Sequence, residues 1–194
     1  MRRSADAVRP RGVDSPRVTA VRRLASGFAV LAVATTLTGA ASAGTSTGTA
    51  SMRSLEASVL VEINAFRTAH GLPLLRVNAR LGAAARQHSE QMALDGYFAH
   101  NSADGSAFWR RIQRFYASSR WQYWSVGENL LWSSPAVDAS RALAMWLASP
   151  EHRANLMNPH WHEIGISAVH ADAAPGVYHG LPVTIVTTDF GARH

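Results

Sequence analysis

The sequence predicts an α+β fold in which helices pack against an antiparallel sheet. Apolar residues recur at helical spacing through most of the chain before residue 160. Two later runs have the patterns of strands: residues 162–170 alternate, with Ile164, Ile166 and Ala168 on one side, and residues 183–190 are rich in Val, Ile and Thr. Most helices precede the strands instead of alternating with them, which favours segregated α+β layers over a repeating βαβ arrangement.

The N-terminal segment has the features of a secretory signal peptide. Arg22 and Arg23 precede an uncharged, mostly apolar run at residues 24–37, and small residues follow up to Ala43. The run is shorter than the roughly 20 residues of a membrane-spanning helix. We therefore expect residues 1–43 to be removed on export, which leaves a secreted protein with no stable membrane span. A retained membrane anchor is the alternative.

The charge of the chain bears on its binding partners, and its lack of cysteine bears on how the domain is stabilised. The full chain has 19 basic and 13 acidic residues, but most of the excess lies in the first 23 residues. The mature chain would carry a net charge of +1, so we expect no nucleic-acid partner. The chain has no cysteine, so the mature domain of about 150 residues must be held together by packing alone.

The first elements after the signal peptide are a linker and a helix. Residues 44–53 are rich in Gly, Ser and Thr, which predicts a flexible linker before a domain at 54–194. Ser54 is the expected N-cap of a helix that Gly71 ends.

A second helix is expected from Asn78, its N-cap, to Gly96, its C-cap. His88 lies on the apolar stripe of this helix. We interpret His88 as a half-buried, hydrogen-bonded core histidine, with a ligand role as the alternative.

Three further helices are predicted from Ser106, Ser134-Pro135 and Ser149-Pro150, because serine caps helices and proline suits the first helical position. The third helix carries a basic cluster, which we expect to be a solvated face: Arg110, Arg111 and Arg114. In the fourth helix the expected inward residues are Val137, Ala144 and Leu147. Residues 127–132 form a predicted strand, and the two C-terminal strands are expected to pair as an antiparallel hairpin.

His100, Glu128 and His152 are the candidate functional residues. Two imidazoles and a carboxylate are ordinary zinc ligands that would leave a position for water. The same groups suit general acid–base catalysis. Because 28 and 24 residues separate them, no single helix presents the set as H-E-x-x-H does. The structural alternative is that the histidines cap loop carbonyls and Glu128 pairs with an arginine or with backbone amides.

An ordered series of motifs resembles the CAP superfamily, whose domain is also called the SCP domain, in its compact bacterial form. The motifs are Glu62-Ile63-Asn64-x-x-Arg67, His70-Gly71-Leu72-Pro73-Leu74, Phe98-Ala99-His100 with Asp104-Gly105, Gly127-Glu128-Asn129-Leu130, Trp146-x-x-Ser149-Pro150-x-His152-Arg153-x-Asn155-Leu156-Met157, and Glu163-Ile164-Gly165-Ile166.

The resemblance implies a three-layer α-β-α sandwich with a short antiparallel sheet and a cleft lined by a His–Glu–Glu–His set. His100 and Glu128 match two of these positions, and His152 matches the second histidine. The position of the second glutamate holds Ser149 here. Glu151 and Glu163 are the candidate replacements, and His88 is a further candidate for the cleft.

The resemblance also implies a function class. Many CAP proteins are secreted without an agreed enzymatic activity, and some bind divalent metal, sterols or other lipids. We therefore expect a secreted binding protein that holds a divalent metal such as zinc, a lipid or cell-envelope ligand, or both. A metal-assisted hydrolase acting on peptide or cell-wall substrates is the alternative. A third interpretation is that Glu128 and the histidines only tie the loop at Gly127 to the helices.

Overall fold

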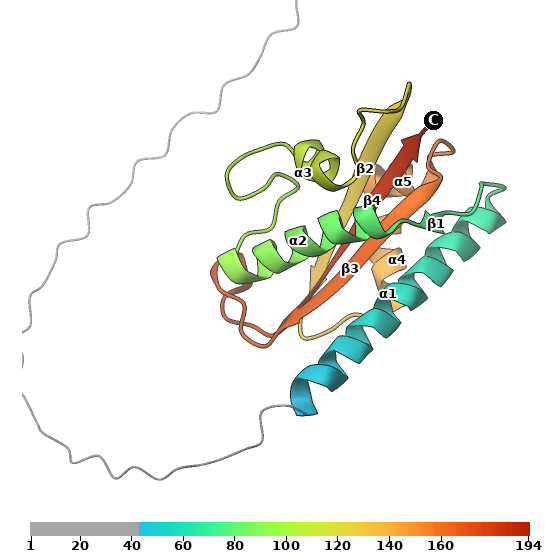
Figure 1. Ribbon diagram of the computed structural model, residues 1–194. Coiled ribbons are helices and arrows are strands. Elements are labelled where there is room, and N and C mark those ends of the chain that lie inside the picture. The colour runs from blue at the N-terminus through green and yellow to red at the C-terminus, as the bar shows by residue number, and fades with distance from the viewer. Residues whose placement is uncertain (1–42) are drawn as a thin grey trace, which may run out of the picture. The chain divides into compact units, whose positions relative to one another are not determined.

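The computed structural model describes residues 43–194 (Figure 1). The predicted signal peptide, apart from its last residue, lies outside the described residues. The elements in chain order are α1 (Ala43–Ala69), β1 (Arg76–Val77), α2 (Ala79–Asp95), α3 (Phe108–Phe115), β2 (Trp124–Ser133), α4 (Ala139–Leu147), α5 (Pro150–Met157), β3 (Glu163–Ala171), the 3-10 helix η1 (Gly176–Tyr178) and β4 (Val183–Arg193). Within this range, no helix is both long and apolar enough to cross a membrane.

The strands form one four-stranded sheet in the order β1-β3-β4-β2. β4 pairs antiparallel with both β3 and β2, so the predicted C-terminal hairpin is confirmed. β1 pairs parallel with β3 through only two residues, Arg76 and Val77. This short edge pairing makes the sheet mixed; the sequence predicts only an extended connection there, because two residues are too few for a strand pattern.

Helices cover both faces of the sheet, as expected for an α-β-α sandwich (Figure 1). Alternate residues of a strand point to opposite faces. Leu131 and Val186 pack in one core cluster with α1, α4 and α5. Leu130 and Ile185 pack in a second cluster with α2. The α+β class and the layered arrangement are therefore confirmed.

The second helix follows its sequence signals closely. Asn78 Oδ1 accepts from the backbone N–H groups of Arg80 and Leu81, and Gly96 ends α2 with a left-handed φ of 70°. α2 lies very close to β3: a Cβ built on Gly165 would lie 2.1 Å from the backbone nitrogen of Gly82. Only glycine at position 165 therefore permits this helix–strand approach.

Arg67 joins α1 to the segment after α5. Its side chain is fully buried. Nη1 donates to the carbonyls of Leu156 and Asn158, at 2.9 and 3.0 Å, and Nε donates to the Pro73 carbonyl at 2.9 Å. The motif Glu62-Ile63-Asn64-x-x-Arg67 therefore contributes to packing through Arg67, because the guanidinium satisfies backbone carbonyls that burial removes from water.

The first residues of α1 and α3 differ from those predicted from the sequence. α1 begins at Ala43 instead of Ser54, so residues 44–53 are helical where a flexible linker was predicted. Met52 and Leu55 pack against the core, which accounts for a helix that extends ahead of Ser54. Ser106 does not cap α3, since its own N–H donates to Asp104 Oδ1 and Ala107 precedes the helix.

The fourth helix also starts later than predicted. Asp138 is its N-cap, with Oδ1 accepting from the Arg141 N–H at 2.8 Å, so Ser134-Pro135 lies ahead of the helix. Ala144 is exposed, and Ala142 and Trp146 face the core in its place. The later start changes which side chains face inward. α5 begins as predicted, with Ser149 as its N-cap and Pro150 in its first turn.

Candidate functional site

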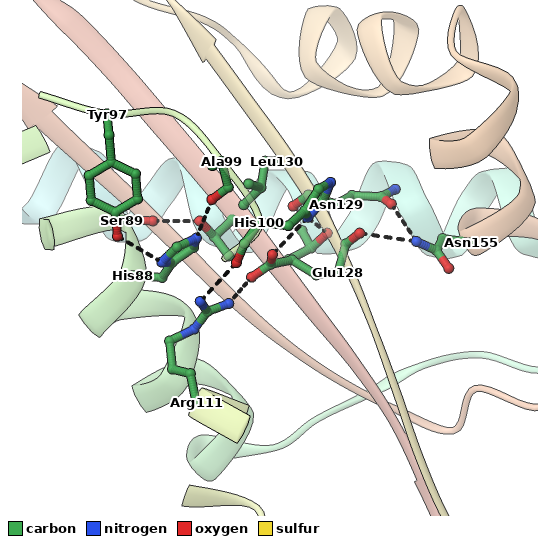
Figure 2. A network of polar contacts seen from close by, with 12 residues as sticks. His88, Ser89, Tyr97, Ala99, His100, Arg111, Glu128, Asn129, Leu130 and Asn155 are labelled. Atoms are coloured by element: carbon green, nitrogen blue, oxygen red, sulfur yellow. Dashed lines mark hydrogen bonds and ion pairs between the residues drawn. The ribbon is translucent and has the colours of Figure 1, made fainter. Parts of the chain in front are cut away.

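His100 and Glu128 form a hydrogen-bonded pair at the centre of the candidate site (Figure 2). His100 lies in the loop after α2, and Glu128 lies on β2 with its side chain facing the α2–α3 layer. His100 Nδ1 is 2.8 Å from Glu128 Oε1. The His100 side chain is 49% exposed, whereas that of Glu128 is 1% exposed. The carboxylate therefore lies behind the imidazole, and the imidazole faces solvent.

Arg111 is the partner of the second Glu128 oxygen. Its Nη2 donates to Glu128 Oε2, and Nη1 donates to the backbone carbonyl of His100 at 3.2 Å (Figure 2). Arg111 is fully buried, so the predicted solvated arginine face is wrong at this position, although Arg110 and Arg114 are exposed. Helical spacing explains the difference, because residue 111 lies three positions after Phe108, on the packed side of α3.

Asp189 supplies a second acid beside Glu128. It lies on β4 directly opposite Glu128 in the antiparallel register, and its side chain is fully buried. Neither Asp189 oxygen accepts a hydrogen bond from a donor among residues 43–194. Burial raises the pKa of Asp189 well above its ordinary value, and the nearby Glu128 charge adds to this effect.

The protonation of the two acids follows from their neighbours. The pKa of Glu128 is raised to about 7, chiefly by burial, although the Arg111 charge and the neighbouring Asp189 act to lower it. Arg111 and His100 both contact Glu128, which favours the ionised form of Glu128. The proton shared by the two acids is therefore assigned to Asp189. An ionised Glu128 only accepts hydrogen bonds, so His100 Nδ1 donates to it and the lone pair lies on Nε2.

His152 lies beside His100 because β2 and α5 are interlocked. The centroids of the two imidazole rings are 6.3 Å apart. Asn129 Nδ2 donates to the His152 carbonyl at 3.0 Å, and Asn155 Nδ2 donates to the Glu128 carbonyl at 3.0 Å. These two hydrogen bonds hold α5 against β2, an edge strand of the sheet.

The surroundings of His100 and His152 favour the neutral form of both imidazoles. Burial lowers the pKa of His100, and the positive charge of Arg111 lowers it further. Burial likewise lowers the pKa of His152, followed by the charge of His100. Neutral imidazole is the form that binds a metal ion or accepts a proton.

His88 lies in the core beneath this site. It is fully buried; Nε2 is 2.9 Å from the Ala99 carbonyl and Nδ1 is 3.4 Å from the Tyr97 hydroxyl (Figure 2). Burial lowers the pKa of His88 to about 3, helped by the Arg111 charge. These contacts match the interpretation of His88 as a hydrogen-bonded core histidine that holds the loop leading to His100.

The two candidate replacements for the second glutamate lie elsewhere. Glu151 is exposed in the first turn of α5, and its charge partly opposes the lowering of the His100 and His152 pKa values. Glu163 is held by Asn78 Nδ2 at 2.7 Å and by the Tyr116 hydroxyl at 2.5 Å. It lines a separate cavity of about 750 Å³. Asp189, which the sequence analysis did not single out, is the acid that lies against Glu128.

The donors present fit a two-histidine metal site better than the predicted three-ligand set. Among residues 43–194, no group of three His, Asp or Glu side chains converges on one point as ligands. Both Glu128 oxygens are occupied by Arg111 and His100. The Glu128 carboxylate is therefore positioned to orient the His100 ring. Carboxylates often support metal-binding histidines in this way.

Comparison with known proteins identifies the family. A model of the family described as "Cysteine-rich secretory protein family", abbreviated CAP, matches residues 60–187. This range runs from within α1 to the first half of β4 and includes His100, Glu128 and His152. The chain belongs to the CAP family.

Two curated relatives match this chain over only part of their own length. The uncharacterized protein YkwD of Bacillus subtilis is 28% identical over 125 residues, which cover 64% of this chain and 46% of YkwD. The uncharacterized membrane protein YlbC of the same organism is 29% identical over 111 residues, 57% of this chain and 30% of YlbC. The chain thus spans less than half the length of these relatives.

Solved structures support the same fold. An extracellular protein containing an SCP domain from Bacillus anthracis has a TM-score of 0.60 and 26% identity, with 80% of this chain and 45% of that chain covered. A cysteine-rich secretory protein from Staphylococcus aureus has a TM-score of 0.52 and 18% identity, with 72% of this chain and 38% of that chain covered. The second likeness bears on the fold alone.

Proposed function

We propose that this CAP domain acts outside the cell and binds a divalent metal ion of the zinc class through His100 and His152. The observation that carries the proposal is the orientation of His100. Its Nδ1 faces the buried Glu128 carboxylate at 2.8 Å, and its ring lies 6.3 Å, centroid to centroid, from that of His152. The second nitrogen of His100 is thereby left as the metal-binding atom.

The chemistry of the two histidines supports this assignment. Their lowered pKa values keep both rings neutral, which metal binding requires. Glu128 fixes the His100 tautomer and raises the basicity of the ring, as carboxylates behind metal-binding histidines do. A bound zinc ion would supply Lewis acidity and open positions for water or for a ligand group.

Localisation outside the cell is supported by two independent observations. Residues 1–43 have the basic, apolar and small-residue order of an export signal. The solved structure from Bacillus anthracis is described as an extracellular protein. We further propose that the partner is a lipid or another component of the cell envelope. This second proposal rests on the CAP resemblance.

Calorimetric titration with zinc tests the metal proposal. The wild-type protein should bind one equivalent, and His100→Ala and His152→Ala should each weaken binding at least tenfold. His160→Ala is the matched control, because His160 is exposed and lies outside the pair; it should bind as the wild type does. Equal binding by all four proteins would refute the assignment of these ligands.

A hydrolase acting on peptides or cell-wall material is the second candidate. One observation favours it: the carboxylate behind His100 resembles the support given to a histidine general base. Turnover of dye-labelled peptidoglycan that disappears in Glu128→Gln, with the fold intact by circular dichroism, would support this function. Turnover unaffected by Glu128→Gln and by His100→Ala would exclude this pair as its source.

A further inference from the structure

We propose that Asp189 is a positioning residue of the candidate site: it fixes the Glu128 carboxylate from behind and, through Glu128, sets the orientation of the His100 ring. The inference rests on the proposed function, since it assigns to Asp189 a part in metal binding at His100. Asp189 itself lies too deep to touch a ligand bound at His100, because it is completely buried.

The sheet register brings the two acids together. Glu128 and Asp189 are directly opposite on adjacent antiparallel strands, so their side chains emerge on the same face. Directly opposite Cβ atoms in such a pair are separated by about 4.5–5.5 Å, close enough for side-chain contact. β4 is an interior strand flanked by β3 and β2. The position of Asp189 is therefore fixed by the centre of the sheet.

The Asp189 side chain makes no hydrogen bond with any other described side chain or backbone group. No donor among residues 43–194 hydrogen-bonds to either of its oxygens, and the polar residue directly opposite it on β2 is Glu128. A carboxyl group buried without a polar partner is strongly disfavoured. The neighbour that explains a buried acid at this point of β4 is therefore Glu128.

The two acids are complementary as donor and acceptor. Arg111 and His100 donate to Glu128, which makes Glu128 the ionised member. Asp189 lies directly opposite and receives no hydrogen bond from any donor among residues 43–194, so it is the member suited to carry the proton and donate it toward Glu128. Glu128 is thus held by donors from three elements: α3, the loop after α2, and β4. Removal of the β4 donor frees the carboxylate to turn, and the His100 ring follows it.

Two substitutions of Asp189 test whether its hydrogen-bond donor or only its volume matters for the orientation of Glu128. Asp189→Asn keeps the size of the side chain and an amide donor toward Glu128. Asp189→Leu keeps the bulk and removes the donor. Ser167→Ala is the matched control, because Ser167 is buried in the neighbouring strand β3 and its hydroxyl has no hydrogen-bond partner among the described residues.

The first readout needs no metal. Nitrogen-15 chemical shifts of the His100 ring report which nitrogen carries the proton. The wild type, Asp189→Asn and Ser167→Ala should show the Nδ1-protonated form, and Asp189→Leu should show a mixture of tautomers. An unchanged His100 tautomer in Asp189→Leu would overturn the proposal, as would an Asp189→Asn protein that behaves like Asp189→Leu.

The second readout is zinc affinity by calorimetry. Groups that support a metal-binding histidine typically contribute about 10–100-fold in affinity, so Asp189→Leu should weaken binding at least tenfold and Asp189→Asn less than about threefold. If the wild type binds no zinc, the metal proposal fails while the tautomer measurement still decides the role of Asp189. If Asp189→Leu does not fold, Asp189→Ser takes its place, since serine is too short to reach Glu128.

Discussion

Substitution of Arg111 by methionine tests whether the buried ion pair organises the site. Methionine fills much of the same volume but leaves Glu128 without its charge partner. The Arg111 and Glu128 side chains are 0% and 1% exposed. Removing one member of such a buried pair costs about 3–5 kcal/mol. For a domain of this size, about 1 kcal/mol shifts Tm by about 2–4 °C, so Arg111→Met should lower Tm by about 10 °C.

A double-mutant cycle separates the ion pair from the loss of packing. Arg111→Met, Glu128→Gln and the double variant are compared by urea denaturation followed by tryptophan fluorescence. Since either single variant leaves one buried charge unpaired, the double variant should lose less stability than the two losses combined, by about 2 kcal/mol. Strict additivity, or a loss below about 1 kcal/mol for Arg111→Met, would refute the assigned pairing. Arg110→Met, at an exposed site, should leave stability unchanged.

Three further predictions concern the scaffold. The pKa of His88 falls from 6.5 to about 3 on folding. The contribution of neutral His88 to stability is therefore complete above pH 6.5 and decreases by about 3 kcal/mol by pH 4. Tm measured from pH 7 to 4 should fall more steeply in the wild type than in His88→Gln, and parallel curves would contradict this. Arg67→Lys should destabilise the domain by about 2–4 kcal/mol in urea denaturation, because one ammonium cannot reach all the carbonyls bound by the guanidinium. A loss of stability below about 0.5 kcal/mol, the usual spread for neutral surface substitutions, would contradict this prediction. Gly165→Ala should yield little folded protein or lower Tm by about 10 °C or more (~3 kcal/mol), since the added Cβ would meet the backbone of α2. A variant with the Tm of the wild type would contradict this prediction and show that α2 can shift.

Much of the fold follows from local signals in the sequence. Asn78 and Gly96 mark the limits of α2 because each acts within one helical turn. Helix starts that depend on tertiary contacts were predicted less well. Nothing within the N-terminal turns of α1 indicates that Met52 would find a place against the core, so the predicted boundary at Ser54 was too late.

The candidate site was only partly predictable for a related reason. His100, Glu128 and His152 are visible as polar residues within motifs, and the structure places them together. Arg111 and Asp189 were missed because their roles depend on contacts between distant segments. Signals did exist: Arg111 shares a helix face with Phe108, and Asp189 is the only charged residue in the Val-, Ile- and Thr-rich run 183–190. A charge within a predicted buried strand indicates a buried partner, but only the strand register identifies it as Glu128.

Zinc binding by His100 and His152 is tested most directly by a crystal structure grown with zinc, with diffraction data collected on both sides of the zinc absorption edge. We expect an anomalous peak within bonding distance of His100 Nε2 and a His152 ring nitrogen, with Glu128 still bound to Arg111 and His100 Nδ1. A crystal with zinc bound elsewhere and no peak between these histidines would contradict it. Direct coordination by a Glu128 oxygen after release of Arg111 would also contradict the supporting role given to that carboxylate.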